Sequence, residues 1–216
     1  MNFVRLNEIL NEYYGNLHWW PAETPEEVVI GAILTQNTSW RNVEKAIENL
    51  KKIGIRNLSQ IVNGDQEKIR EAIKPSGFYN QKTARLISVS RAIQSAGGID
   101  SLRKMDDASL SHFLSSLKGV GKETEESIMI YALGRKKFVV DKYTMRIFSR
   151  TGIIQSETIL PTELKNEIEN RMSLEELNNF HGALVNLGKD FCKTKPVCVQ
   201  CPVRNECNYA KDFTLP

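Results

Sequence analysis

Apolar residues recur at spacings of three and four along nearly all of this 216-residue chain. That spacing is the period of an amphipathic helix. It predicts helices over about 2–14, 25–34, 41–52, 66–73, 80–95, 107–117, 123–133, 141–150, 161–170 and 173–189, joined by connections that contain Gly or Pro. No segment sustains the alternation of a strand, and the apolar run 138–140 is too short to build a sheet. The sequence therefore predicts an all-α fold.

Composition limits the kind of protein further. Hydrophobic residues make up 41% and charged residues 25%, which is typical of a globular chain. The longest apolar stretch, Val28–Leu34, is far shorter than the roughly 20 residues that cross a bilayer. The first ten residues carry Asn and Glu within their apolar run, which does not fit a signal peptide. We expect a cytoplasmic protein without a membrane partner, and the net charge of +3 permits an anionic partner without requiring one.

Two short motifs lie in the middle of the chain. Leu117–Thr124 places Gly119 and Gly121 between two amphipathic helices, which predicts a tight hairpin. Backbone amides at such a hairpin can hold a phosphate, although an ordinary helix–turn–helix connection has the same pattern. Asp141 follows the apolar pair Val139-Val140 and starts the next helix. By itself, an acid in that position is most often a helix N-cap.

All four cysteines of the chain, Cys192, Cys198, Cys201 and Cys207, fall within 16 residues. In a reducing compartment such a group indicates a metal site rather than disulfides. Four thiolates can hold a tetrahedral zinc ion or a 4Fe–4S cluster. Structural zinc sites usually contain two close pairs, whereas only the central pair is close here. The spacing favours iron–sulfur over zinc.

The hairpin, the aspartate and the cysteine loop, in this order, resemble the helix-hairpin-helix DNA glycosylase superfamily typified by endonuclease III. The resemblance covers nearly the whole chain, and Glu123 and Asp141 stand 18 residues apart, the separation that joins the catalytic lysine position to the essential aspartate in that superfamily. The first cysteine gap is one residue shorter than the usual pattern. The resemblance implies a C-terminal 4Fe–4S cluster loop and two helical lobes, one of residues 23–135 and the other of residues 1–22 and 136–216.

A second departure from the pattern bears on the chemistry. Glu123 occupies the position of the lysine that acts in bifunctional members. A β-lyase needs an amine to form a Schiff base with the sugar, and a carboxylate cannot do this. The neighbouring Lys122 would point about 100° away from Glu123 on a helix. The inference is a monofunctional DNA glycosylase of base excision repair, in which Asp141 positions or deprotonates water.

Within the superfamily, the chain is similar to the endonuclease III-like 3-methyladenine DNA glycosylases. The shared segments are 18–21, 34–38, 74–82, 121–123 and 140–143, although some members of that branch lack the cysteine cluster. An N3-methylated adenine is cationic, so aromatic faces can bind it. Trp20 and Trp40, with Pro21 shaping the site, are candidates for the base pocket, and Glu123 is a candidate to contact the base. Each tryptophan could instead be core, and Glu123 could be a dipole-favoured acid of a helix's first turn.

The resemblance implies a partner, double-stranded DNA with a damaged base, bound by a monomer associated with the nucleoid. Gln36 matches the glutamine that fills the space of the extruded nucleotide, and Phe78 is a candidate wedge or an anchor of its own loop. The expected phosphate contacts are Lys118, Gly119, Gly121 and Lys122. The alternatives are a glycosylase for deaminated or mismatched bases, a bifunctional glycosylase/lyase, and a DNA-binding module without catalysis.

Overall fold

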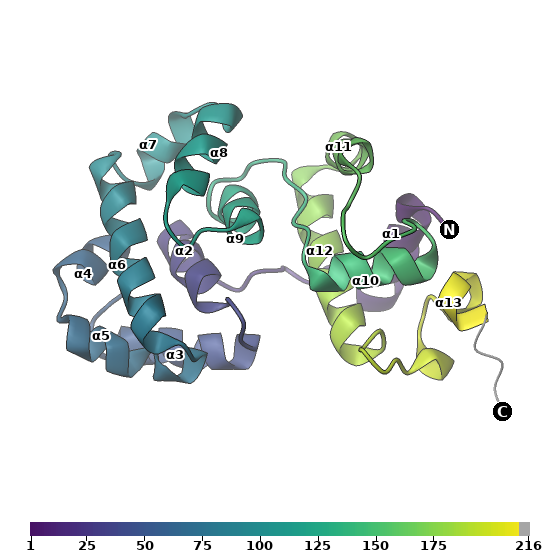
Figure 1. The fold of residues 1–216 in the computed structure, drawn as a ribbon, viewed down its shortest axis with the longest axis horizontal. Helices are drawn as coiled ribbons and strands as arrows, with labels where there is room; N and C mark the ends of the chain where they lie inside the picture. The colour runs from purple at the N-terminus through teal and green to yellow at the C-terminus, as the bar shows by residue number, and fades with distance from the viewer. Residues whose placement is uncertain (212–216) are drawn as a thin grey trace. The chain divides into compact units, whose positions relative to one another are not determined.

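A computed structural model describes residues 1–211, and among these residues every regular element is a helix (Figure 1). The predicted all-α fold is therefore confirmed. The chain divides into two compact units: unit 1 contains Met1–Pro21 and Lys136–Pro216, and unit 2 contains Ala22–Arg135. Unit 1 thus combines the two ends of the chain, and unit 2 is one continuous segment.

Unit 2 is a set of helices packed around one buried helix. Its elements are α2 (Pro25–Leu34), α3 (Trp40–Lys52), α4 (Leu58–Asn63), α5 (Gln66–Ala72), a 3₁₀ turn (Lys74–Ser76), α6 (Tyr79–Ser95), α7 (Ile99–Lys104), α8 (Asp107–Ser116), α9 (Lys122–Ser127) and a π-helical turn (Ile128–Ala132). Helix α2 is the centre, because every residue from Glu27 to Leu34 is buried and the helix packs on α3, α6, α9 and the π-helical turn. Thr24 caps its start by accepting a hydrogen bond from the Glu27 amide.

A buried lysine completes the end of α2. Lys82 is 1% exposed, and its ammonium donates to the carbonyl oxygens of Leu34 at 2.8 Å and Ser76 at 2.7 Å. The last carbonyls of a helix have no partner within it, so this side chain satisfies one of them. Helix α6 is therefore joined to α2 by polar bonds as well as by apolar packing.

Unit 1 is built around its longest helix. Its elements are α1 (Phe3–Tyr14), α10 (Lys142–Thr151), α11 (Thr162–Arg171), α12 (Leu174–Asp190), 3₁₀ turns at Cys198–Gln200 and Arg204–Glu206, and α13 (Asn208–Lys211). Helices α1 and α10 both pack on α12. Phe138, Phe148 and Phe180 are fully buried, with ring centroids 5.7–6.2 Å apart, and Phe138 stacks on the other two rings. This aromatic cluster joins the segment before α10 to both α10 and α12.

Two features differ from the sequence prediction. Helices α4, α7 and α13 were not expected, because each has only four to six residues and too few apolar positions to show a period. The predicted helix over 123–133 is present as α9 followed by a π-helical turn over Ile128–Ala132. A spacing of three and four does not distinguish this wider turn from an α-helix.

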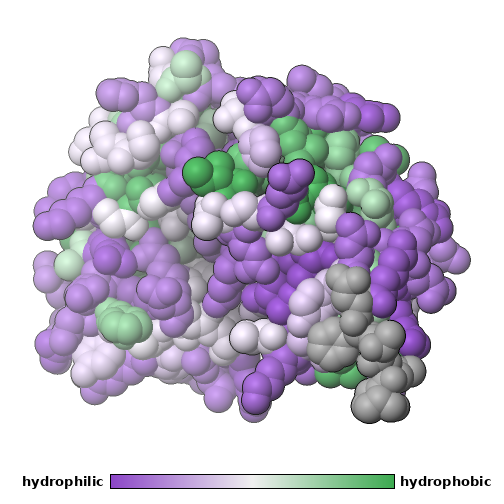
Figure 2. All heavy atoms as spheres, turned by 45° about the vertical axis from the view of Figure 1, so that its right-hand side comes forward, coloured by the Kyte–Doolittle hydropathy of each residue, from purple (hydrophilic) through white to green (hydrophobic). Residues whose placement is uncertain are grey.

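The visible surface is largely polar. Figure 2 shows one face on which hydrophilic side chains predominate, with smaller hydrophobic patches between them. None of the helices over residues 1–211 has the length and apolar character needed to span a membrane.

Candidate active site

Asp141 is held at the start of α10 by its own helix. Its backbone is extended, and its Oδ1 accepts hydrogen bonds from the Thr144 amide at 2.8 Å and the Thr144 hydroxyl at 3.0 Å. The N-cap geometry is thus present, and the side chain is only 9% exposed. Burial alone would raise the pKa of Asp141, but His181 and the Thr144 donors outweigh it and lower the pKa below its usual value. The carboxylate is therefore kept ionised.

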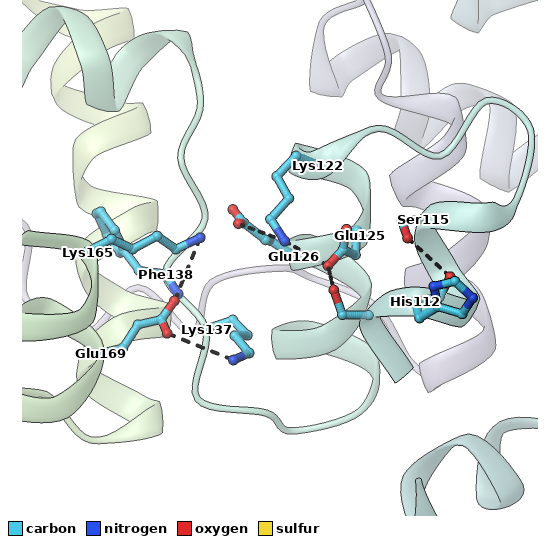
Figure 3. A network of polar contacts seen from close by, with 10 residues as sticks. His112, Ser115, Lys122, Glu125, Glu126, Lys137, Phe138, Lys165 and Glu169 are labelled. Carbon is cyan, nitrogen blue, oxygen red and sulfur yellow. Dashed lines mark hydrogen bonds and ion pairs between the residues drawn. The ribbon is translucent and has the colours of Figure 1, made fainter. Parts of the chain in front are cut away.

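The chain that leads into Asp141 is fixed from two sides. Phe138 lies in the aromatic cluster, and its amide donates to Glu169 Oε1 on α11 at 2.9 Å. Lys137 and Lys165 lie 3.9 and 3.8 Å from the same carboxylate, as Figure 3 shows. A buried ring and an anchored amide three residues upstream leave Asp141 little freedom to move.

His181, on α12, lies next to Asp141. Its Nε2 is 3.7 Å from Asp141 Oδ2, and the histidine is 5% exposed. The edge of the Trp19 ring meets the imidazole, with centroids 6.1 Å apart and planes at 87°. A Cβ at Gly182 would stand 2.6 Å from the Trp19 ring, so only glycine allows this close packing. Unit 1 thus places Trp19, His181 and Asp141 in one contact chain.

The hairpin of unit 2 is tight at one glycine and open at the other. The Val120 amide donates to the Leu117 carbonyl at 3.0 Å, and Gly119 has φ +89°, a conformation that favours glycine. Gly121 is the extended N-cap residue of α9, and a Cβ there would meet no heavy atom of the protein within 4 Å. The space beside Gly121, at the start of α9, is therefore not filled by other parts of the protein.

Acidic residues dominate the helix that follows the hairpin. Glu125 and Glu126 are buried, whereas Glu123 and Lys122 are exposed in the first turn. Lys122 Nζ reaches back to Glu125 at 2.8 Å and lies 3.8 Å from Glu126 (Figure 3). Glu125 also accepts a hydrogen bond from the Ser111 hydroxyl. The ammonium of Lys122 is thus paired with its own helix.

Gln36 belongs to a network that supports the hairpin. Its amide donates to the Gly119 carbonyl at 2.9 Å and to the Thr124 hydroxyl at 3.1 Å. Arg85 donates to Gln36 Oε1 at 2.6 Å. Entry of Gln36 into a DNA duplex, as predicted from the sequence, would require it to exchange these bonds.

Strained backbone is concentrated in the segments that the sequence singled out. Among residues 1–211, the non-glycine residues with positive φ are His18, Trp20, Asn37 and Phe78. Such conformations cost about 1–3 kcal/mol each and collect at functional sites. Phe78 caps α6 with its side chain 64% exposed, so it does not anchor its loop in the core. A ring presented in this way is available to a partner.

The pocket candidates belong to separate units. Trp20 is half-buried and Pro21 is exposed in unit 1, while Trp40 is half-buried at the first turn of α3 in unit 2. A half-buried indole keeps one part packed and another part accessible.

The cysteine loop is attached to α10. All four cysteines are free thiols, and all four line one cavity together with apolar side chains of α10 and α12. Arg150 donates to the Cys192 sulfur at 3.4 Å and to the Lys193 carbonyl at 2.6 Å, and Arg146 donates to the Cys192 carbonyl at 2.7 Å. Burial raises the pKa of the Cys201 thiol to about 12. Within residues 1–211, no three His, Cys, Asp or Glu side chains are grouped so as to hold a single metal ion.

These features match a known family of repair proteins. The sequence model of the HhH-GPD superfamily of base excision DNA repair proteins matches residues 30–173, which include the hairpin and Asp141. The chain belongs to this superfamily. A protein of Methanocaldococcus jannaschii, named as a candidate DNA repair glycosylase, is 45% identical over 94% of both chains. The chain is accordingly a DNA repair glycosylase of the HhH-GPD superfamily.

Three further proteins with lower identity are also similar to this chain. Endonuclease III of Thermotoga maritima is 28% identical over 86% of this chain and 83% of that protein. The structure of Helicobacter pylori 3-methyladenine DNA glycosylase bound to 1,N6-ethenoadenine has a TM-score of 0.73 and is 29% identical, covering 88% of this chain and 98% of that one. A trapped endonuclease III–DNA intermediate has a TM-score of 0.80 at 19% identity, which shows the shared fold.

The structure of this glycosylase adds a residue that sequence reasoning missed. The sequence predicts no role for His181 at the site, yet this residue lies beside Asp141 from a position 40 residues later in the chain. No local pattern marks such a contact. The only available signal was its position in the apolar stripe of a long helix, where a buried polar group needs a partner.

Proposed function

We propose that this glycosylase is monofunctional and hydrolyses the N-glycosidic bond of alkylated bases of the 3-methyladenine type. The observation that carries the proposal is Glu123, at the start of α9 and 18 residues before Asp141, where a lyase needs an amine. A carboxylate cannot form a Schiff base with the sugar. The neighbouring Lys122 is paired with Glu125, and a protonated amine has no electron pair for attack.

Asp141 has the properties that hydrolysis requires. Its pKa is lowered, so at neutral pH it is ionised and can stabilise a positively charged sugar or accept a proton from water. Water forms the new bond to C1′ while the bond to the base breaks, and the base leaves with that electron pair. Because a 3-methylated adenine is already cationic, the pair neutralises it, and no strong general acid is needed.

The aromatic side chains support this choice of substrate. A cationic base binds to electron-rich ring faces, and Trp20 and Trp40, with Pro21, are the pocket residues that we propose. The exposed Glu123 would complement the positive charge of the base. The 29% identical 3-methyladenine glycosylase, whose structure contains an ethenoadenine, is in line with an alkylated base.

The proposed DNA contacts combine exposed side chains with residues of the hairpin and its supporting network. Phe78 would enter the duplex, and Lys118, Gly119, Gly121 and Lys122 would contact phosphates around the hairpin, with Gln36 filling the space of the extruded base. We propose that the protein acts as a monomer on double-stranded DNA in the cytoplasm.

We propose that Cys192, Cys198, Cys201 and Cys207 hold a 4Fe–4S cluster. The four thiols line one cavity. Four cysteine thiolates are the ligand set of a 4Fe–4S cluster. The cluster would order this loop, and Arg150 would remain a hydrogen-bond donor to the Cys192 sulfur.

The test is a base-release assay on duplexes that carry methylated, uracil, hypoxanthine, thymine-glycol or mismatched bases, each with and without alkali. We expect release of 3-methyladenine, with strand breaks only after alkali. Breaks without alkali, or a borohydride-trapped complex, would show a lyase. If only mismatched bases or oxidised pyrimidines are released, the assignment of 3-methyladenine as the substrate is wrong.

Two variants sharpen the assay. Glu123→Lys is expected to gain a borohydride-trapped complex, whereas Glu123→Gln, its uncharged control, is not.

A separate measurement tests the cluster. About four irons per chain and visible absorbance are expected in protein purified without oxygen, and Cys201→Ser should reduce both. One zinc per chain would instead support the alternative metal.

A further inference from the structure

Both oxygens of the Asp141 carboxylate face a partner. Oδ1 accepts two hydrogen bonds from Thr144, which fixes that oxygen to the first turn of α10. Oδ2 faces His181 Nε2 at 3.7 Å. A carboxylate held at one oxygen can still rotate about the bond to Cβ, so a second partner is what sets its plane.

His181 is itself held in place. It is 5% exposed, and Trp19 packs edge-on against its ring. Trp19 lies against Gly182, where a side chain would collide with the indole. The imidazole therefore lies between a fixed indole and the reactive carboxylate, and its orientation is set before substrate binds.

The other charged groups of these elements point elsewhere. On α10, Lys142 and Arg146 lie over the Tyr143 ring, at 5.5 and 5.2 Å from its centre. On α12, Lys189 lies over the Trp19 ring at 5.8 Å. The group of α12 that faces Asp141 is thus His181, and from α10 the Thr144 donors act.

We propose that His181 is a positioning residue for Asp141. A proton on Nε2 directs the imidazole at Oδ2, fixes the plane of the carboxylate and favours its ionised form. His181 does not take the proton of the attacking water and does not touch the substrate. This inference rests on the proposed role of Asp141 in base release.

The experiment compares two amide replacements of His181. His181→Gln keeps an N–H group close to the position of Nε2, whereas the amide of His181→Asn is too short to reach Oδ2. The matched control is His112→Gln, because His112 is an exposed histidine on α8. Each full-length protein is assayed for release of 3-methyladenine from methylated duplex DNA under single turnover across the pH range, and its melting temperature and DNA affinity are measured.

We expect His181→Asn to lower the rate at pH 7 about tenfold, because the carboxylate loses the group that faces Oδ2. The acid limb of its pH–rate profile should move to higher pH, because Asp141 loses a partner that favours its ionised form. His181→Gln should recover most of the rate, His112→Gln should match the wild type, and DNA affinity should not change. If His181→Asn melts below the assay temperature, His181→Leu takes its place.

Two results would overturn the proposal. One is a folded His181→Asn protein with the rate and pH profile of His112→Gln. The other is His181→Gln as impaired as His181→Asn, which would mean that only packing matters. Asp141→Asn separates this outcome from the proposed function: if that variant still releases the base, the role of Asp141 fails whatever His181 does.

Discussion

The two glycines of the hairpin should respond differently to the same substitution. Gly119→Ala places a Cβ at φ +89°, about 2.7 Å from the Arg85 side chain. A left-handed conformation costs a non-glycine residue about 1–2 kcal/mol. For a chain of this length, each kcal/mol lowers the melting temperature by roughly 2–4 °C. We therefore expect a decrease of about 2–8 °C, with the Arg85–Gln36 bond disturbed as Arg85 moves.

Gly121→Ala should leave stability nearly unchanged. Gly121 has φ −88°, and the added Cβ meets no protein atom within 4 Å, so the change is expected to stay within about 0.5 kcal/mol. The methyl group would instead occupy the space through which a phosphate approaches the amides of α9. Loss of one hydrogen bond to a charged group, about 1.5–3 kcal/mol, would weaken DNA binding roughly tenfold to a hundredfold.

The assay pairs thermal unfolding followed by circular dichroism with fluorescence anisotropy on a labelled duplex at fixed salt. The two variants serve as controls for each other, because each adds one methyl group to the same hairpin. Wild-type affinity in Gly121→Ala would refute the phosphate site at this hairpin. A wild-type melting temperature in Gly119→Ala would refute the argument from backbone strain.

Three further perturbations test the fold and the DNA contact. Phe138→Ala should lower the free energy of unfolding by about 3–5 kcal/mol in a denaturant titration, because its buried ring leaves a cavity. Burial, with the charge of Arg85, lowers the pKa of Lys82 from 10.5 to about 8, so the unfolded chain binds more protons between these values. The unfolding free energy of the wild type, taken relative to that of Lys82→Met, should therefore rise with pH across that window. Phe78→Ala should keep the melting temperature, since the ring is exposed, yet reduce affinity for duplex DNA in a binding titration.

Local signals predicted much of the fold. Asp141 was expected to start a helix, which it does, and the Thr24 cap of α2 is a feature of the same local kind. These features depend on residues within one turn of each other, so a sequence displays them directly. The exposure of Phe78 could not be predicted from local sequence. A loop phenylalanine can pack under its own loop or face outward, and the tertiary structure decides between the two.

Contacts between distant residues could not be predicted in the same way. Lys82 looks like an ordinary helical lysine until its partners, the carbonyls of Leu34 and Ser76, are in place. His181 meets Asp141 only because α10 packs on α12, and Trp19 fits only because position 182 is glycine. The energy of such contacts comes from burial, which is a property of the packed structure rather than of a sequence window.

Helix α10 connects Asp141, which we propose as the catalytic carboxylate, to the cysteine loop. Asp141 caps its start, while Arg146 and Arg150, later in the helix, bind the carbonyls of Cys192 and Lys193. Disorder in the loop would remove hydrogen-bond partners from both arginines. Because the arginines and Asp141 belong to the same helix, the position of Asp141 would then change as well. A cysteine variant with reduced base release would therefore not by itself show redox chemistry. A structural coupling through α10 should change the melting temperature and the rate together, whereas a redox role should depend on the oxidation state at constant stability.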